Sequence, residues 1–119
     1  MREILKQRTK AFAIKTIILC SKLPKRPEYF IISKQLIRCA TSVGANYRAS
    51  CRARSRADFI NKLSIVEEEA DESMYWMELL CQLSDEFSDE IHQLTDEANQ
   101  LVAIFVASKK TARIHSPHS

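Results

Sequence analysis

Glycine and proline are scarce in this chain: its 119 residues contain one glycine and three prolines. Sandwiches and barrels of β-strands need frequent turns, and glycine and proline supply many of them. This scarcity excludes a turn-rich all-β fold. The chain is rich instead in Ala, Leu, Ile, Glu, Lys and Arg, which favour helices. The composition therefore predicts an all-α protein.

Paired cysteines and long apolar runs are also missing. The four cysteines show no CxxC spacing, no histidine lies near them at a metal-ligand interval, and each lies among apolar residues: Cys20, Cys39, Cys51 and Cys81. Free cysteines in such surroundings act as small hydrophobic residues, which is typical of a reducing compartment. The longest apolar runs are too short to span a bilayer, and no secretory h-region follows Met1. We expect a cytoplasmic protein without membrane contact.

The sequence lacks the patterns of known catalytic sites. Di-metal sites in helical bundles take Glu-x-x-His motifs from two helices, but the only histidines are His92, His115 and His118. There is no Gly-rich phosphate loop and no strand-turn-helix nucleophile elbow. We therefore expect a non-enzymatic protein with no catalytic residue, metal, cofactor or small-molecule substrate.

Apolar periodicity predicts four helices, with approximate ranges 2–22, 28–52, 56–83 and 88–113. Pro24 and Pro27 end the first, and Ser55 and Ser88 are expected N-caps of the last two. Four amphipathic helices joined by short loops are typical of an antiparallel, up-down-up-down four-helix bundle. We expect one bundle domain, residues 1–113, and a disordered C-terminal tail, residues 114–119.

Three of the predicted helices carry an apolar face that we assign to the core. The first has two heptad lines, Leu5–Phe12–Leu19 and Ile4–Ala11–Ile18. The predicted core positions of the third helix are Phe59, Leu63, Val66, Ala70, Met74, Met77 and Cys81. Those of the fourth are Ile91, Leu94, Ala98, Leu101, Val102 and Phe105.

The second predicted helix is two-sided. Its core stripe consists of Leu36, Ala40, Val43, Tyr47 and Cys51. Its opposite side is basic and continues into the following bend: Lys34, Arg38, Arg48 and Arg52, then Arg54 and Arg56. The small Gly44 indicates close approach of another helix. Among the aromatic residues, Tyr29, Phe30 and Tyr47 can stack on bases, although core packing explains them more simply.

The basic side has two interpretations. Repeated around an oligomer, it forms a positive field that contacts the phosphates of RNA or DNA by charge, without sequence-specific readout. Alternatively, these residues are solvated or paired with the acidic side chains of the third helix: Glu67, Glu68, Glu69, Asp71 and Glu72.

Charge is divided between the two halves of the chain. Residues 1–62 hold 15 Lys/Arg and 3 Asp/Glu, whereas residues 63–119 hold 3 Lys/Arg and 12 Asp/Glu. Either the two halves attract each other, inside one molecule or between copies, or the basic half meets a polyphosphate.

The third helix carries a second apolar stripe, which a helix in a monomeric bundle does not need: Ile65, Trp76, Leu79 and Leu83. We expect another copy of the chain to bury this stripe and form a homo-oligomer. The alternative is that the connection between the third and fourth helices covers it.

Several segments resemble a known family. The run from Gln35 to Arg48, QLIRCATSVGANYR, and the later segments RSRADF, KLSI, EADE and YWMELL are similar to the 23S rRNA-intervening sequence proteins. The detailed match covers the second and third helices, whereas the first and fourth match only in pattern. One departure is Ala49, because many relatives carry Glu at this position.

This resemblance implies a small antiparallel four-helix bundle that is often a ring-shaped homopentamer, with no established enzyme activity. It also implies an association with RNA, and distant relatives serve a reverse transcriptase as basic accessory proteins. Our leading hypothesis is a homo-oligomeric scaffold or adaptor associated with RNA. The alternative is a dedicated nucleic-acid-binding protein that uses the basic side of the second helix.

Overall fold

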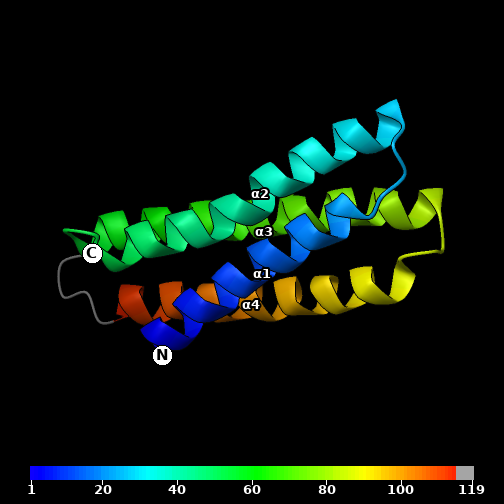
Figure 1. Ribbon diagram of the computed structural model, residues 1–119. Helices are drawn as coiled ribbons and strands as arrows, with labels where there is room; N and C mark the ends of the chain where they lie inside the picture. Colours follow the sequence, from blue (N-terminus) through cyan, green and yellow to red (C-terminus); the bar gives the residue numbers. More distant parts are fainter. Residues whose placement is uncertain (115–119) are drawn as a thin grey trace.

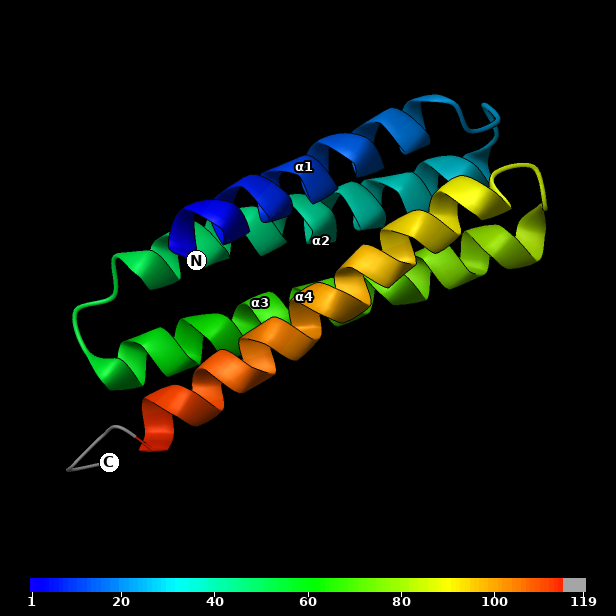
Figure 2. The same ribbon diagram turned by 90° about the horizontal axis from the view of Figure 1, so that it is seen from below.

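Four helices run back and forth along one axis in the computed structural model, which describes residues 1–114 (Figure 1). They are α1 (Arg2–Ser21), α2 (Pro27–Cys51), α3 (Arg56–Leu83) and α4 (Ser88–Ile114). Helices that follow each other in sequence lie antiparallel, and the molecule is elongated, with extents of 52 × 21 × 20 Å (Figure 2). The predicted all-α four-helix bundle is confirmed, and each predicted helix end agrees within one turn.

Local chemistry explains where the helices begin. Pro27 opens α2, where its missing N–H costs nothing. The Ser55 hydroxyl accepts a hydrogen bond from the Asp58 backbone N–H at 3.0 Å, as its predicted N-cap role requires. Ser88 is instead the first helical residue of α4. At the other end of α4, Ile114 is helical although we predicted it in the tail; residues 115–119, the rest of that predicted tail, lie outside the described residues.

The buried positions of all four helices follow a seven-residue repeat. Examples are Leu5–Phe12–Leu19 in α1, Tyr29–Leu36–Val43–Ser50 in α2, Leu63–Ala70–Met77 in α3 and Ile91–Ala98–Phe105 in α4. A repeat of seven averages 3.5 residues per turn, slightly less than the 3.6 of a straight helix. Such helices keep their apolar sides together by coiling gently around one another, as in left-handed bundles.

This repeat corrects part of the predicted core of α1 and α3. In α1, Ile4 and Ile18 are exposed, and Thr9 and Thr16 are buried in the core face. The Thr16 hydroxyl donates to the Phe12 carbonyl at 2.8 Å, so its burial leaves no polar atom unpaired. In α3, the structure buries Ser73 and Leu80, whereas the predicted core positions Phe59, Met74 and Cys81 are half-buried. The predicted α3 line advanced too far per turn for a coiled bundle.

The oppositely charged halves of the chain form ion pairs inside one molecule, as the interpretation of mutual attraction predicted. The Arg8 guanidinium of α1 donates to Glu97 of α4 at 3.0 Å, and Lys22 donates to Glu90 at 3.0 Å. These pairs bridge α1 and α4, the pair of adjacent helices with the thinnest packing. Ion pairs therefore help to hold these two helices together where their apolar contact is weakest.

Gly44 lies where α2 passes the backbone of α1, as the sequence predicted. A Cβ atom added there would meet the Thr9 carbonyl oxygen at 3.5 Å, an ordinary van der Waals distance. The backbone of Gly44 has no positive φ. We expect Gly44→Ala to stabilise the protein by about 0.5–1 kcal/mol, because alanine loses less backbone entropy in a helix. Urea unfolding at fixed protein concentration measures this, and a lower midpoint for the variant would contradict it.

Candidate nucleic-acid interface

α2 is two-sided in the structure, as predicted. Val43 and Tyr47 are buried in the core, whereas the basic residues of the opposite side are exposed: Lys34, Arg38, Arg48, Arg52, Arg54 and Arg56. Of the predicted core stripe, Cys51 is half-buried. The orientation on which the nucleic-acid hypothesis depends is therefore correct.

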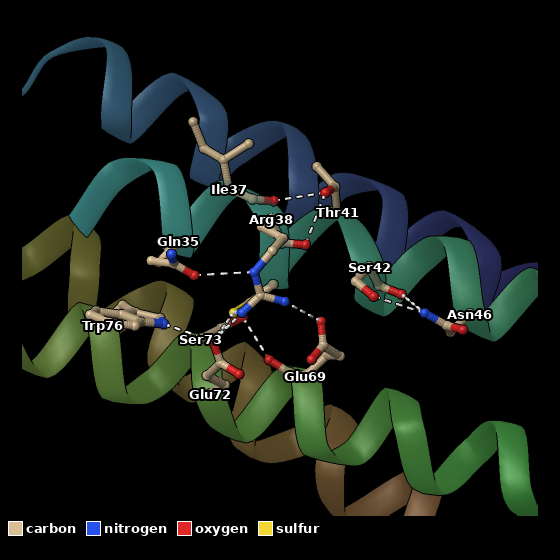
Figure 3. A network of polar contacts seen from close by, with 11 residues as sticks. Gln35, Ile37, Arg38, Thr41, Ser42, Asn46, Glu69, Glu72, Ser73 and Trp76 are labelled. Carbon is tan, nitrogen blue, oxygen red and sulfur yellow. Dashed lines mark hydrogen bonds and ion pairs between the residues drawn. The ribbon is translucent and has the colours of Figure 1, made fainter. Parts of the chain in front are cut away.

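Arg38 is held by α3. Its guanidinium forms ion pairs with Glu72 and, at 3.2 Å, with Glu69, and its Nε donates to Gln35 (Figure 3). For this residue the structure supports the salt-bridge interpretation over the phosphate one. Glu67 of the same acidic run pairs instead with Lys109 of α4 at 3.1 Å.

The Glu72 carboxylate is the centre of this network. Its Oε2 accepts from the Cys39 thiol at 2.9 Å, from the Trp76 indole N–H at 3.0 Å and from Arg38. These donors, the thiol first, lower the pKa of Glu72. Burial, together with the Glu72 carboxylate, raises the pKa of the Cys39 thiol to about 12. The thiol therefore stays protonated near neutral pH and supplies no nucleophile.

We expect the Glu72→Gln variant to lose less stability in acid than the unmodified protein does. Because the pKa of Glu72 in the folded protein lies below its ordinary value of 4.5, its contribution is present above that pH and is lost as the pH falls through the lower folded pKa. Urea unfolding at pH 7 and at several pH values below 4.5 should show a smaller drop for Glu72→Gln than for the unmodified protein. Glu78→Gln, an exposed position on α3 outside the network, is the control. Equal drops for all three proteins would contradict the prediction.

The remaining arginines gather at one end of the bundle. Arg48, Arg52, Arg54 and Arg56 lie around the turn from α2 to α3, and none forms an ion pair with another described residue. Lys34 lies about 20 Å further along α2, given a rise of 1.5 Å per residue. The predicted basic side of α2 is thus divided: Arg38 in its middle is paired with glutamates of α3, whereas the arginines around the α2–α3 turn form no such ion pair in the described part of the chain.

Other helices bring further charge to the same end. The start of α1 and the finish of α4 lie beside the α2–α3 turn (Figures 1 and 2). Residues 1–6, 48–58 and 108–114, which we call the basic end, contain nine Lys/Arg and two Asp/Glu. At the opposite end, residues 20–30 and 80–92 contain three Lys/Arg and five Asp/Glu. Lys110 and Arg113, close to the end of α4, belong to the basic end although they are far in sequence from the arginines of α2.

Within residues 1–114, no group of three or more His, Cys, Asp or Glu side chains is placed to hold a metal ion. In the same part of the chain, no helix combines the length and hydrophobicity that crossing a membrane requires.

Comparison with known proteins decides the family. A sequence model of the 23S rRNA-intervening sequence proteins matches residues 3–107. The chain belongs to this family. A solved structure from Bacteroides thetaiotaomicron, a protein of unknown function from the S23 ribosomal protein family, is 33% identical, with a TM-score of 0.84 over 92% of this chain and 99% of that chain. No curated protein matches this sequence.

The description of the 23S rRNA-intervening sequence proteins names no enzyme activity. The segments that carried the resemblance face each other across α2 and α3, and they include Arg38, Cys39, Glu72 and Trp76 of the polar network. Ala49, the departure from many relatives, is half-buried beside Arg48.

The predicted oligomer interface of this family member is partly covered by its own chain. Trp76 and Leu79 are half-buried against the core, Ile65 is half-buried, and Leu83 is exposed. Ile65 lies about 16 Å along α3 from Trp76 and is not continuous with the other three.

The sequence analysis missed exposed apolar residues on α2. The Cys39–Glu72 contact shows which residues of the antiparallel α2 and α3 are level with each other: Ile31, eight residues before Cys39, lies level with Leu79 and Leu80. Ile31 is 65% exposed. Phe30, which core packing was expected to explain, is 60% exposed, whereas Tyr29 is buried as expected. We call Ile31, Trp76, Leu79 and Leu83 the apolar seam.

Proposed function

We propose that this protein is a non-catalytic, homo-oligomeric scaffold that associates through its apolar seam and holds RNA at its basic end. The observation that carries the proposal is the separation of these two surfaces. Ile31 near the start of α2 and Arg52, the residue that follows α2, lie about 30 Å apart. Copies that meet at the seam therefore leave their basic ends free for a polyanion.

The apolar seam supports self-association. Large apolar side chains that are exposed next to one another commonly mark an interface, since water is excluded from them on association. Ile31 of α2 and Leu83 of α3, 65% and 48% exposed, lie at the same end of the bundle as the half-buried Trp76 and Leu79 of α3. The family resemblance favours a pentamer.

The basic end supports RNA binding by charge. Several unpaired guanidinium groups close together raise the local positive potential, and binding to phosphates releases the counterions that surround a nucleic acid. Arginine also suits phosphate because its planar donors form two parallel hydrogen bonds. Repetition of the end around an oligomer multiplies the effect by avidity.

Light scattering after gel filtration tests the assembly. At tens of micromolar we expect a mass that is a multiple of the 13.7 kDa chain, fivefold if the protein is a pentamer. Ile31→Glu is expected to lower that mass, because it places a charge in the seam. Ile4→Glu is the matched control, since Ile4 is 59% exposed but lies at the other end of the bundle. A monomer for the unmodified chain would remove the scaffold proposal.

Fluorescence anisotropy with single-stranded RNA and duplex DNA at two salt concentrations tests the basic end. We expect RNA binding that weakens steeply with salt. Absence of binding to either nucleic acid at low salt would contradict the proposed role. If monomeric Ile31→Glu keeps the full RNA affinity, the alternative, a dedicated nucleic-acid-binding protein, is favoured over a scaffold that depends on avidity.

A further inference from the structure

A groove lies at the basic end, where α1 begins, α3 begins and α4 ends. Its volume is about 540 Å³, within the usual size of small-molecule pockets. Its walls combine an aromatic ring, aliphatic side chains and two hydroxyl groups, from Phe59, Ile104, Ala107, Ser108 and Thr111. Arg56 also lines it.

The groove lies beside arginines that have no ion pair with another described residue. Arg56 is part of the wall, and Arg52 and Arg54 precede it in the turn from α2 to α3. A neutral apolar ligand would leave these charges unused. A simple polyanion would leave the Phe59 ring and the aliphatic wall unused. A nucleotide in a single strand uses both, because its base is flat and apolar on its faces and its phosphates are anionic.

We propose that this groove takes one unstacked base of a single-stranded RNA, with the neighbouring phosphates on Arg52, Arg54 and Arg56. The base packs against the Phe59 ring, and Ser108 and Thr111 offer hydroxyl groups to its edge. This inference rests on the RNA binding proposed above and adds a preference for unpaired strands. A base in a duplex enters only after it has been unstacked and unpaired.

The test compares oligouridine with an abasic oligonucleotide of equal length, which has the same phosphates and no bases. We expect the full chain to bind oligouridine roughly tenfold more tightly at the same salt concentration. Ala107→Leu fills the groove from an exposed helical position. It should reduce this difference in affinity and leave the affinity for the abasic strand unchanged. Ala103→Leu is the matched control, since Ala103 is exposed one turn earlier on α4 and does not line the groove.

A second variant tests the aromatic wall. Phe59→Leu keeps an apolar side chain but removes the ring, and its folding is checked by circular dichroism and thermal unfolding. It should also reduce the difference in affinity between oligouridine and the abasic strand. An unchanged difference in a folded Phe59→Leu protein would contradict stacking on this ring.

The remaining outcomes distinguish a base site in the groove from charge-driven RNA binding at the basic end. Equal affinity of the unmodified chain for the two strands overturns the base site and leaves charge-driven RNA binding intact. Failure to bind either strand overturns both proposals. If Ala107→Leu lowers the mass in light scattering and keeps the base preference, the groove accommodates a second copy of the chain, and the base site is wrong.

Discussion

Reversal of two charges at the basic end, Arg48→Glu together with Arg52→Glu, is expected to weaken RNA binding about a hundredfold at about 0.1 M salt. Both side chains are exposed and have no ion pair among the described residues. The substitutions therefore remove phosphate contacts and add repulsion without breaking an internal pair. The slope of log affinity against log salt concentration should also become shallower, by roughly one for each lost contact.

The control for this experiment has the same change in net charge at another place. Lys15→Glu together with Lys25→Glu alters two exposed lysines of α1 and the following loop, away from the basic end. We expect at most a small loss of RNA affinity, since charges separated by more than about 10 Å are screened at 0.1 M salt. Equal losses in the two double variants would mean that RNA responds to net charge alone and that the basic end is not a site.

Removal of the Phe105 ring is expected to cause the largest loss of stability. Phe105 of α4 is fully buried, and its ring centroid lies 5.6 Å from that of Tyr47 on α2. It therefore links helices that are not neighbours in sequence. Phe105→Ala should destabilise the fold by about 3–5 kcal/mol, because it removes buried apolar surface and leaves a cavity. That is a large part of the stability of a typical domain.

Urea unfolding at one fixed protein concentration measures this loss, because association would make the midpoint depend on concentration. Val106→Ala is the neighbouring control: Val106 is 38% exposed, so its truncation should cost far less. Similar midpoints for Phe105→Ala and Val106→Ala would show that the core does not depend on this ring.

The predicted interface illustrates how far a sequence pattern can be interpreted. Trp76 and Leu79 recur at helical spacing outside the main core stripe of α3, and the sequence analysis assigned them to a partner. In the structure they pack partly against their own core. The hydropathy of a side chain shows that it avoids water, but not whether its own chain or another copy covers it. Ile31 was missed because its significance depends on its position level with Leu79 of another helix.

Arg38 and the groove at Phe59 show the same limit for charge and shape. Arg38 and Arg48 look equivalent along α2, yet only Arg38 lies opposite Glu69 and Glu72. The groove requires Phe59 of α3 and Ala107 of α4 to meet at one end of the molecule. Neither contact has a signature within a single helix.

The sequence by itself determined the helical class, the approximate ends of four helices and the two-sided character of α2, because backbone propensity and apolar periodicity act within a few turns of one chain segment. Only the tertiary structure decided which arginine is neutralised, which cations share an end and which apolar residues remain exposed. Those properties depend on the choice of neighbouring helices and on their axial register, and many distant residues set that register together through the packing of the core.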